Sequence, residues 1–159
     1  MKAIILAGGR GKRLRPITDK IPKPLIPINN KPLIERTIKY LKKYGVTQII
    51  ISAGYKSNLI EKFLKQKKNF GCGIIFSIEK TPLGTGGAIK KALKHIDEDS
   101  FLVLNGDIVT NIDLRKIMKK ENTIAANELK TKFGTMNIKN NKILNFNEKK
   151  DVTNVWMNP

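Results

Sequence analysis

The sequence predicts an α/β fold in which helices cover a mixed, mainly parallel sheet, giving three layers. Short apolar runs alternate with segments of helical spacing along nearly the whole chain of 159 residues, which is the pattern of strand–helix–strand units. Glycine-rich or charged segments directly follow several of the apolar runs. No linker, repeat or low-complexity tract divides the chain, so the pattern indicates one domain.

The first part of the chain predicts two strands separated by a helix. Residues 2–7 are an apolar run that ends at glycine, as a buried strand does. Residues 32–44 carry apolar side chains at helical spacing; Pro32 suits the first turn of a helix, and Gly45 ends it. The apolar run at 48–52 is expected to be the second strand.

The middle of the chain repeats this alternation. Residues 58–67 place leucine, isoleucine and phenylalanine on one helical face, and residues 73–78 form an apolar strand. A helix is expected at 87–96, after a run of glycines, and a strand at 101–105. A short helix is expected at 114–120.

The remaining expected elements are strands. Residues 123–128 are typical of a strand, and two further runs, 134–139 and 142–147, lie on either side of Asn140 and Asn141. Asparagine tolerates the left-handed dihedral angles of a two-residue turn. The sequence therefore predicts an antiparallel hairpin about this asparagine pair.

Composition and charge narrow the class of protein. Cys72 is the only cysteine, so no disulfide can form within the chain, and Met1 leads directly into the first strand without a signal peptide. Both features favour a cytoplasmic protein. No apolar run is long enough for a membrane span. The net charge of +18 could attract nucleic acid, but the lysines are spread out with few aromatic residues between them, so no specific nucleic-acid partner is expected.

The segment after the first strand is the most informative part of the chain. Gly8, Gly9 and Gly11 let the backbone approach a bulky anion and direct amide groups toward it. Arginine and lysine neutralise phosphate charge, and the cations that follow the strand are Arg10, Lys12, Arg13, Arg15 and Lys23. The expected ligand is a compact polyanion, most naturally a nucleoside triphosphate.

Two better-known phosphate motifs do not fit this loop. A Walker A loop needs Ser or Thr after its Gly-Lys pair, but here Gly11-Lys12 is followed by Arg13. A dinucleotide fingerprint needs a third glycine three residues after the second, and that residue is Leu14. The glycines taken alone would suit a basic surface turn equally well.

Longer motifs occur in one order along nearly the whole chain. They are L-A-G-G-x-G-x-R-L-x-P at 6–16, P-K-P-L at 22–25, E-x-x-P-L-G-T-G-G-A at 79–88, L-N-G-D at 104–107 and F-N-E-K at 146–149. Together they resemble the sugar-1-phosphate nucleotidyltransferases, most of all the mannose- and heptose-1-phosphate guanylyltransferases. The resemblance implies the Rossmann-like nucleotide-diphospho-sugar transferase fold as a single domain, 1–159. Its nucleotide half would cover about 1–110, and its sugar-phosphate half would start in about 111–159.

The resemblance also implies a reaction and roles for the residues that match. A sugar 1-phosphate attacks the α-phosphorus of a nucleoside triphosphate, and pyrophosphate leaves. Arg13 would hold the triphosphate, Lys23 would bridge the reacting phosphates, and Asp107 would bind Mg²⁺. The residues expected to contact the nucleotide are Leu6, Ala7, Gly8, Gly9, Gly11, Glu79, Pro82, Gly84 and Thr85.

The sugar phosphate would be bound by residues nearer the C-terminus. By resemblance these are Asn105, Gly134, Glu148, Lys149 and Asn158. The family pattern then continues past the last residues of this sequence, where a later aspartate supplies a second metal ligand. We therefore expect a C-terminally incomplete fold that binds NTP but turns over sugar 1-phosphate slowly or not at all. Its open sheet edge would favour a homo-oligomer.

Other functions remain open from sequence. Thymidylyl- or uridylyltransferases for glucose 1-phosphate share nearly all these motifs, and a choline-phosphate cytidylyltransferase is an alternative with the same fold. A non-catalytic relative could bind nucleotide or sugar phosphate without turnover. A basic nucleic-acid-binding module is the alternative outside the family.

Overall fold

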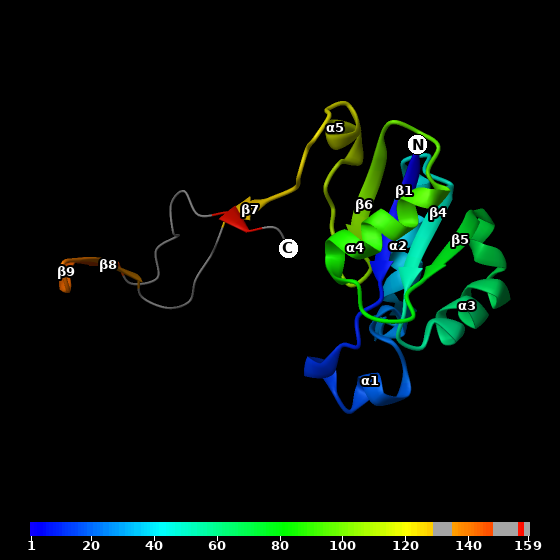
Figure 1. Ribbon diagram of the computed structural model, residues 1–159, viewed down its shortest axis with the longest axis horizontal. Helices are drawn as coiled ribbons and strands as arrows, with labels where there is room; N and C mark the ends of the chain where they lie inside the picture. The colour runs from blue at the N-terminus through cyan, green and yellow to red at the C-terminus, as the bar shows by residue number, and fades with distance from the viewer. Residues whose placement is uncertain (129–134, 148–155, 158–159) are drawn as a thin grey trace. The chain divides into compact units, whose positions relative to one another are not determined.

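The computed structural model describes residues 1–128, 135–147 and 156–157. The chain forms two compact units, Met1–Met118 and Lys119–Pro159. The first unit contains the central sheet, the helices that cover it and all the elements that follow the strands of the sheet (Figure 1). The α/β fold predicted from the sequence is confirmed in this unit.

The central sheet has four parallel strands. They are β1 (Lys2–Ala7), β4 (Gln48–Ala53), β5 (Gly73–Ile78) and β6 (Phe101–Asn105). Their order across the sheet is β5-β4-β1-β6, with β1 paired to both β4 and β6. The chain therefore runs outward from β1 to β5 and then returns to the other side of β1. This reversal of strand order leaves a crevice at the carboxyl ends of β1 and β6, which is where open α/β sheets bind ligands.

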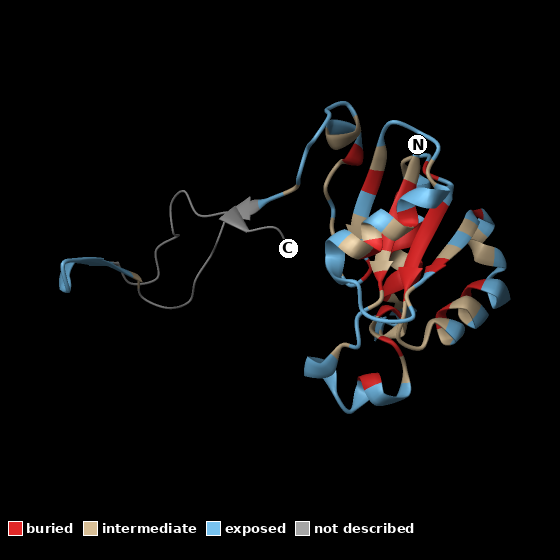
Figure 2. Ribbon diagram, in the orientation of Figure 1, coloured by how far each residue is buried: buried red, intermediate tan, exposed pale blue. Residues whose placement is uncertain are grey.

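Helices cover both faces of the sheet. On one face, α2 (Leu33–Lys43) and α3 (Ser57–Gln66) bury an apolar cluster that includes Ile38 and Ile60 against alternate residues of β1 and β4. On the other face, α4 (Gly84–Ala92) packs Ala92 against Ile4 and Ile50. Figure 2 shows the buried residues concentrated in β1 and β4 at the middle of the sheet. Removal of this apolar surface from water holds the strand ends in place.

Two predicted elements differ from the structure. The helix expected at 87–96 begins earlier, at Gly84, and ends at Ala92 before a 3₁₀ turn at Leu93–His95. Just before the first turn the Leu83 amide donates a hydrogen bond to the Glu79 carboxylate, and Gly84, the first residue of the helix, has a φ of 69° that glycine adopts without strain. The strand expected at 123–128 is wrong for most of its length.

Only Asn127–Glu128 (β7) of that segment is a strand, and it pairs antiparallel with Trp156–Met157 (β10). The residues before it bury little surface: Ile124 is 74% exposed. A segment whose side chains do not pack against a core gains little stability from joining a sheet.

The hairpin prediction is confirmed, and a second asparagine pair makes a turn of the same kind. Thr135–Lys139 (β8) pairs antiparallel with Lys142–Asn147 (β9), and Asn140 and Asn141 both have positive φ. A second pair of asparagines, Asn29 and Asn30, turns the short strands Pro27–Ile28 (β2) and Lys31–Pro32 (β3) in the same way.

The segment between β1 and α2 contains short helices that the sequence did not predict. They are a 3₁₀ turn at Lys12–Leu14, the single turn α1 (Ile17–Lys20) and a 3₁₀ turn at Lys23–Leu25. The last helix of the first unit is α5 (Leu114–Met118). None of the helices among the described residues has the length and apolar character needed to cross a membrane.

Candidate functional site

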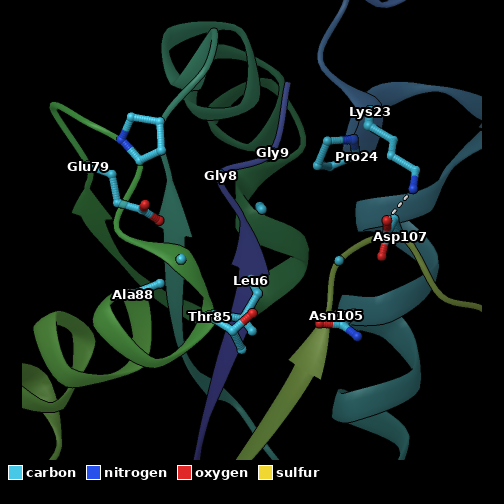
Figure 3. A pocket seen from close by; sticks show the side chains of 14 residues that line it. Leu6, Gly8, Gly9, Lys23, Pro24, Glu79, Thr85, Ala88, Asn105 and Asp107 are labelled. Carbon is cyan, nitrogen blue, oxygen red and sulfur yellow. Dashed lines mark hydrogen bonds and ion pairs between the residues drawn. The ribbon is translucent and has the colours of Figure 1, made fainter. Parts of the chain in front are cut away.

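A pocket of about 300 Å³ lies at the carboxyl ends of the strands in the first unit (Figure 3). Its walls come from the ends of β1, β5 and β6, from the start of α4 and from the 3₁₀ turn that carries Lys23. The lining residues are Leu6, Ala7, Gly8, Gly9, Lys23, Pro24, Glu79, Pro82, Gly84, Thr85, Ala88, Asn105, Gly106 and Asp107. Segments that are far apart in sequence therefore meet where the strand order reverses.

Gly106 brings the end of β6 close to β1. Its amide donates a hydrogen bond to the Leu6 carbonyl over 2.8 Å. A Cβ at this position would lie 2.9 Å from the same carbonyl oxygen, so only glycine allows this approach without a shift of backbone. The contact fixes Asp107, the next residue, at the rim of the pocket beside the glycine loop.

Lys23 and Asp107 form an ion pair at this rim (Figure 3). The two side chains come from elements 84 residues apart in sequence, and each is about one-third exposed. Pro22 and Pro24 flank the lysine, and both are buried, so the backbone that carries the ammonium group is stiff on either side. A cation and a carboxylate are thus held together at one end of the pocket.

Glu79 lies on the opposite side of the pocket, across the glycine loop (Figure 3). Its two carboxylate oxygens accept hydrogen bonds from different elements. The Ser52 hydroxyl of β4 donates to Oε1 over 3.0 Å, and the Leu83 amide donates to Oε2 over 3.1 Å. Gly8 permits this placement, because a Cβ there would lie 2.7 Å from Oε1. The carboxylate is therefore fixed against the glycine loop.

The glycine loop is also anchored where it leaves the pocket. Thr18 is 1% exposed, and its hydroxyl donates to the Gly11 carbonyl over 3.0 Å. Gly11 has a φ of 62°, and a Cβ there would lie 2.9 Å from the Thr18 methyl group. The Tyr55 hydroxyl donates to the Thr18 carbonyl over 3.0 Å. The segment after β4 thus holds the loop in one conformation.

Most of the sequence-predicted site residues converge on the pocket. Eleven of them line it: Leu6, Ala7, Gly8, Gly9, Lys23, Glu79, Pro82, Gly84, Thr85, Asn105 and Asp107. Gly11 and Arg13 are not lining residues: Gly11 packs on Thr18, and Arg13 is exposed on the 3₁₀ turn that follows. The others, Gly134, Glu148, Lys149 and Asn158, lie outside the described residues, so their roles stay predictions.

Arg13→Ala is expected to remove most of the melting-temperature increase that a nucleoside triphosphate gives, while the unliganded melting temperature changes little. The exposed guanidinium has no ion pair among the described residues, so it is available to the triphosphate, and a ligand that binds only the folded state raises the melting temperature. Thermal unfolding with and without GTP measures this. Arg115→Ala, which also removes one guanidinium, is the control; an unchanged increase in Arg13→Ala would place the triphosphate elsewhere.

Sequence reasoning missed Ser52, Thr18 and Tyr55, which position the site without lining it. Ser52 had a visible signal, because it is a polar residue inside an otherwise apolar strand. The contacts of Thr18 and Tyr55 connect segments 37 residues apart, and no local pattern reports such a contact.

The residues at the rim suit a metal ion that is shared with phosphate groups. The described part of the chain holds no group of three His, Cys, Asp or Glu side chains that could enclose a metal ion. Mg²⁺ commonly takes one or two carboxylates and completes its shell with substrate phosphates and water. Asp107 fits that requirement.

Asp113 and Asp151 could each bind a metal ion by residue type alone, but Asp113 has a different partner. The Arg115 guanidinium hydrogen-bonds its carboxylate and lowers the pKa of Asp113 to about 2. This carboxylate is outside the pocket. The other candidate by type, Asp151, lies outside the described residues.

Comparison with known proteins gives consistent results. Residues 2–155 match the family model described as nucleotidyl transferase. The D-glycero-α-D-manno-heptose 1-phosphate guanylyltransferase of Aneurinibacillus thermoaerophilus is 41% identical over 157 residues, covering 94% of this chain and 68% of that protein. The mannose-1-phosphate guanyltransferase beta-B of Xenopus laevis is 39% identical over 147 residues, and the match covers 86% of this chain and 41% of the Xenopus protein.

A solved structure agrees with these relatives. The crystal structure of HddC from Yersinia pseudotuberculosis complexed with GMP-PN superposes with a TM-score of 0.71 at 32% identity. The match covers 94% of this chain and 70% of that one.

Proposed function

This chain belongs to the nucleotidyl transferase family, and from that premise we propose that it transfers a guanylyl group from GTP to the 1-phosphate of a mannose- or heptose-type sugar. The sugar-phosphate oxygen forms a bond to the α-phosphorus of GTP, the bond to the β-phosphate oxygen breaks, and pyrophosphate leaves. The relatives named for heptose and mannose 1-phosphate guanylyl transfer support this choice of substrates.

The observation that carries the proposal is the division of the pocket into two ends. Lys23 and Asp107 form a charged end, suited to phosphates and to a metal ion that binds them. Glu79 and the start of α4 form the other end, where a carboxylate can accept hydrogen bonds from a base. The glycine loop lies between them (Figure 3), where a ribose and α-phosphate would approach its backbone.

The carboxylate of Glu79 supports guanine over uracil and thymine. An ionised carboxylate accepts hydrogen bonds and donates none. Guanine presents two neighbouring donors, N1–H and the N2 amino group, on one edge. Uracil and thymine present one donor between two acceptors, so when that donor bonds one oxygen of Glu79, an acceptor of the base faces the other oxygen with no hydrogen between them. A thymidylyl- or uridylyltransferase would be better served by an amide side chain at this position.

Catalysis would rest on positioning and charge. Phosphoryl-type transfer needs little covalent help from the protein, and it depends on in-line geometry and on cations near the oxygens that gain charge. Lys23 would lie between the α-phosphate and the incoming sugar phosphate, and Arg13 would bind the departing pyrophosphate. Mg²⁺ bound through Asp107 would neutralise phosphate charge. Asn105, at the end of β6, would contact the sugar.

A pyrophosphate-release assay across GTP, ATP, CTP, UTP and dTTP, each with mannose, heptose and glucose 1-phosphates, tests the proposal. GTP with mannose or heptose 1-phosphate should give the highest rate. Preference for UTP or dTTP with glucose 1-phosphate would favour the alternative transferases. GTP binding with no release from any pair would support the non-catalytic relative instead.

A further inference from the structure

Ser52 is a polar residue at the centre of the sheet. It lies in β4, where the neighbouring positions of the strand are isoleucine or alanine, and it is fully buried. Its partners across the sheet are Leu6 on β1 and Ser77 on β5, all on the face that α4 covers. Removal of a hydroxyl from water costs free energy, and a hydrogen bond inside the protein offsets that cost.

The partner of Ser52 is the carboxylate at the base end of the pocket. Ser52 Oγ donates to Glu79 Oε1, while the Leu83 amide donates to Oε2 and the Glu79 amide donates to the Ala53 carbonyl over 2.7 Å. Gly8 borders Oε1 on another side, because a Cβ at this position would lie 2.7 Å from that oxygen. The backbone and both oxygens of Glu79 are therefore fixed by neighbouring groups.

We propose that Ser52 is a positioning residue that sets the choice of base, by holding Glu79 so that each carboxylate oxygen keeps one free lone pair directed into the pocket. The inference rests on the proposed function, because it takes the base end of the pocket to be where guanine binds. Each carboxylate oxygen accepts about two hydrogen bonds. One on each is used inside the protein, and the second remains for the two neighbouring donors of guanine. To accept hydrogen bonds from two neighbouring donors of one base, both carboxylate oxygens must be held in the plane of that base, in one orientation.

Ser77 shows that burial alone does not require this contact. It is 2% exposed, lies directly beside Ser52 in the neighbouring strand, and its hydroxyl has no partner within the described residues. The two serines thus share strand register, burial and chemistry, and they differ in that Ser52 bonds Glu79. Ser77→Ala is for this reason a matched control for Ser52→Ala.

The test is equilibrium binding of GTP and UTP to wild type, Ser52→Ala and Ser77→Ala, with the melting temperature of each unliganded protein. Loss of a hydrogen bond to a charged group should weaken GTP binding about tenfold in Ser52→Ala. UTP binding should change little, so the preference for GTP should fall by nearly the same factor. Ser77→Ala should bind both nucleotides as wild type does.

A double variant separates positioning from a general structural role. If Ser52 acts through Glu79, then Ser52→Ala should have no further effect on the GTP to UTP ratio in a Glu79→Ala background. A persistent effect in that background, or an equal loss of GTP and UTP binding in Ser52→Ala, would overturn the inference. If the wild type prefers GTP and Ser52→Ala keeps the same preference, the inference about Ser52 is wrong while the proposed function stands. Failure of the wild type to bind any nucleotide would overturn the proposed function as well.

Discussion

Asp107→Asn is expected to lower the rate of pyrophosphate release about a thousandfold, because a neutral amide would hold a divalent cation far more weakly than the carboxylate, and that cation would supply positive charge to the reacting phosphates. The substitution keeps the size of the side chain and removes its charge. Gly106 fixes the backbone of this residue against Leu6, so the amide should stay at the rim of the pocket. The rate constant under saturating substrates and the Mg²⁺ dependence of GTP binding together measure the effect.

Asp113→Asn is the matched control for this loss. Its carboxylate is bonded to Arg115 outside the pocket, so the same chemical change there should leave GTP binding and turnover close to wild type. Full activity of Asp107→Asn, or turnover by the wild type in excess EDTA, would show that Asp107 does not hold a metal ion needed for the reaction.

Glu79→Gln is expected to shift base preference from GTP toward UTP and dTTP, changing the ratio of their kcat/KM values by about a hundredfold. The glutamine can be held as the glutamate is. Its oxygen can accept from the Leu83 amide, and its amino group can donate to the Ser52 hydroxyl, which is able to accept as well as donate. The pocket would then present one donor and one acceptor, which matches uracil or thymine and leaves guanine with an unmatched donor.

Glu61→Gln provides the control for this switch. Glu61 lies on α3 and pairs with Lys65 away from the site, so its amide variant should keep the wild-type ratio. An equal fall in kcat/KM for GTP and UTP in Glu79→Gln would mean that Glu79 supports the loop without reading the base.

Much of the fold was predictable because its signals are local. The apolar runs that became β1, β5 and β6 and the helical spacing of α2 are each contained in a dozen residues or fewer. The asparagine pair of the β8–β9 hairpin is similarly local. In a parallel sheet the segments that follow the strands leave from one edge, and the segments after β1, β5 and β6 accordingly line one pocket.

The interior support of the site was not predictable in the same way. The Leu83 amide, just before α4, bonds a side chain four residues earlier, and the hydrogen bond from Ser52 in β4 reaches Glu79, just after β5, across 27 residues of sequence. The ion pair of Lys23 with Asp107 spans 84 residues. Such contacts depend on the order of the strands in the sheet. Hydrophobic periodicity indicates which face of a strand or helix is buried, but it does not indicate which strand lies next to it.

The central claim is that the pocket at the ends of β1, β5 and β6 holds GTP with its phosphates at Lys23. Calorimetric titration of GTP with Mg²⁺ into wild type, Lys23→Ala and Lys94→Ala tests it most directly. Lys94 is an exposed lysine in the 3₁₀ turn after α4, so its loss controls for the general attraction of a chain of net charge +18 to anions. The account predicts one GTP site in wild type and Lys94→Ala, and binding weakened about tenfold or more in Lys23→Ala. Equal affinity in all three proteins, or no GTP binding to any of them, would contradict it.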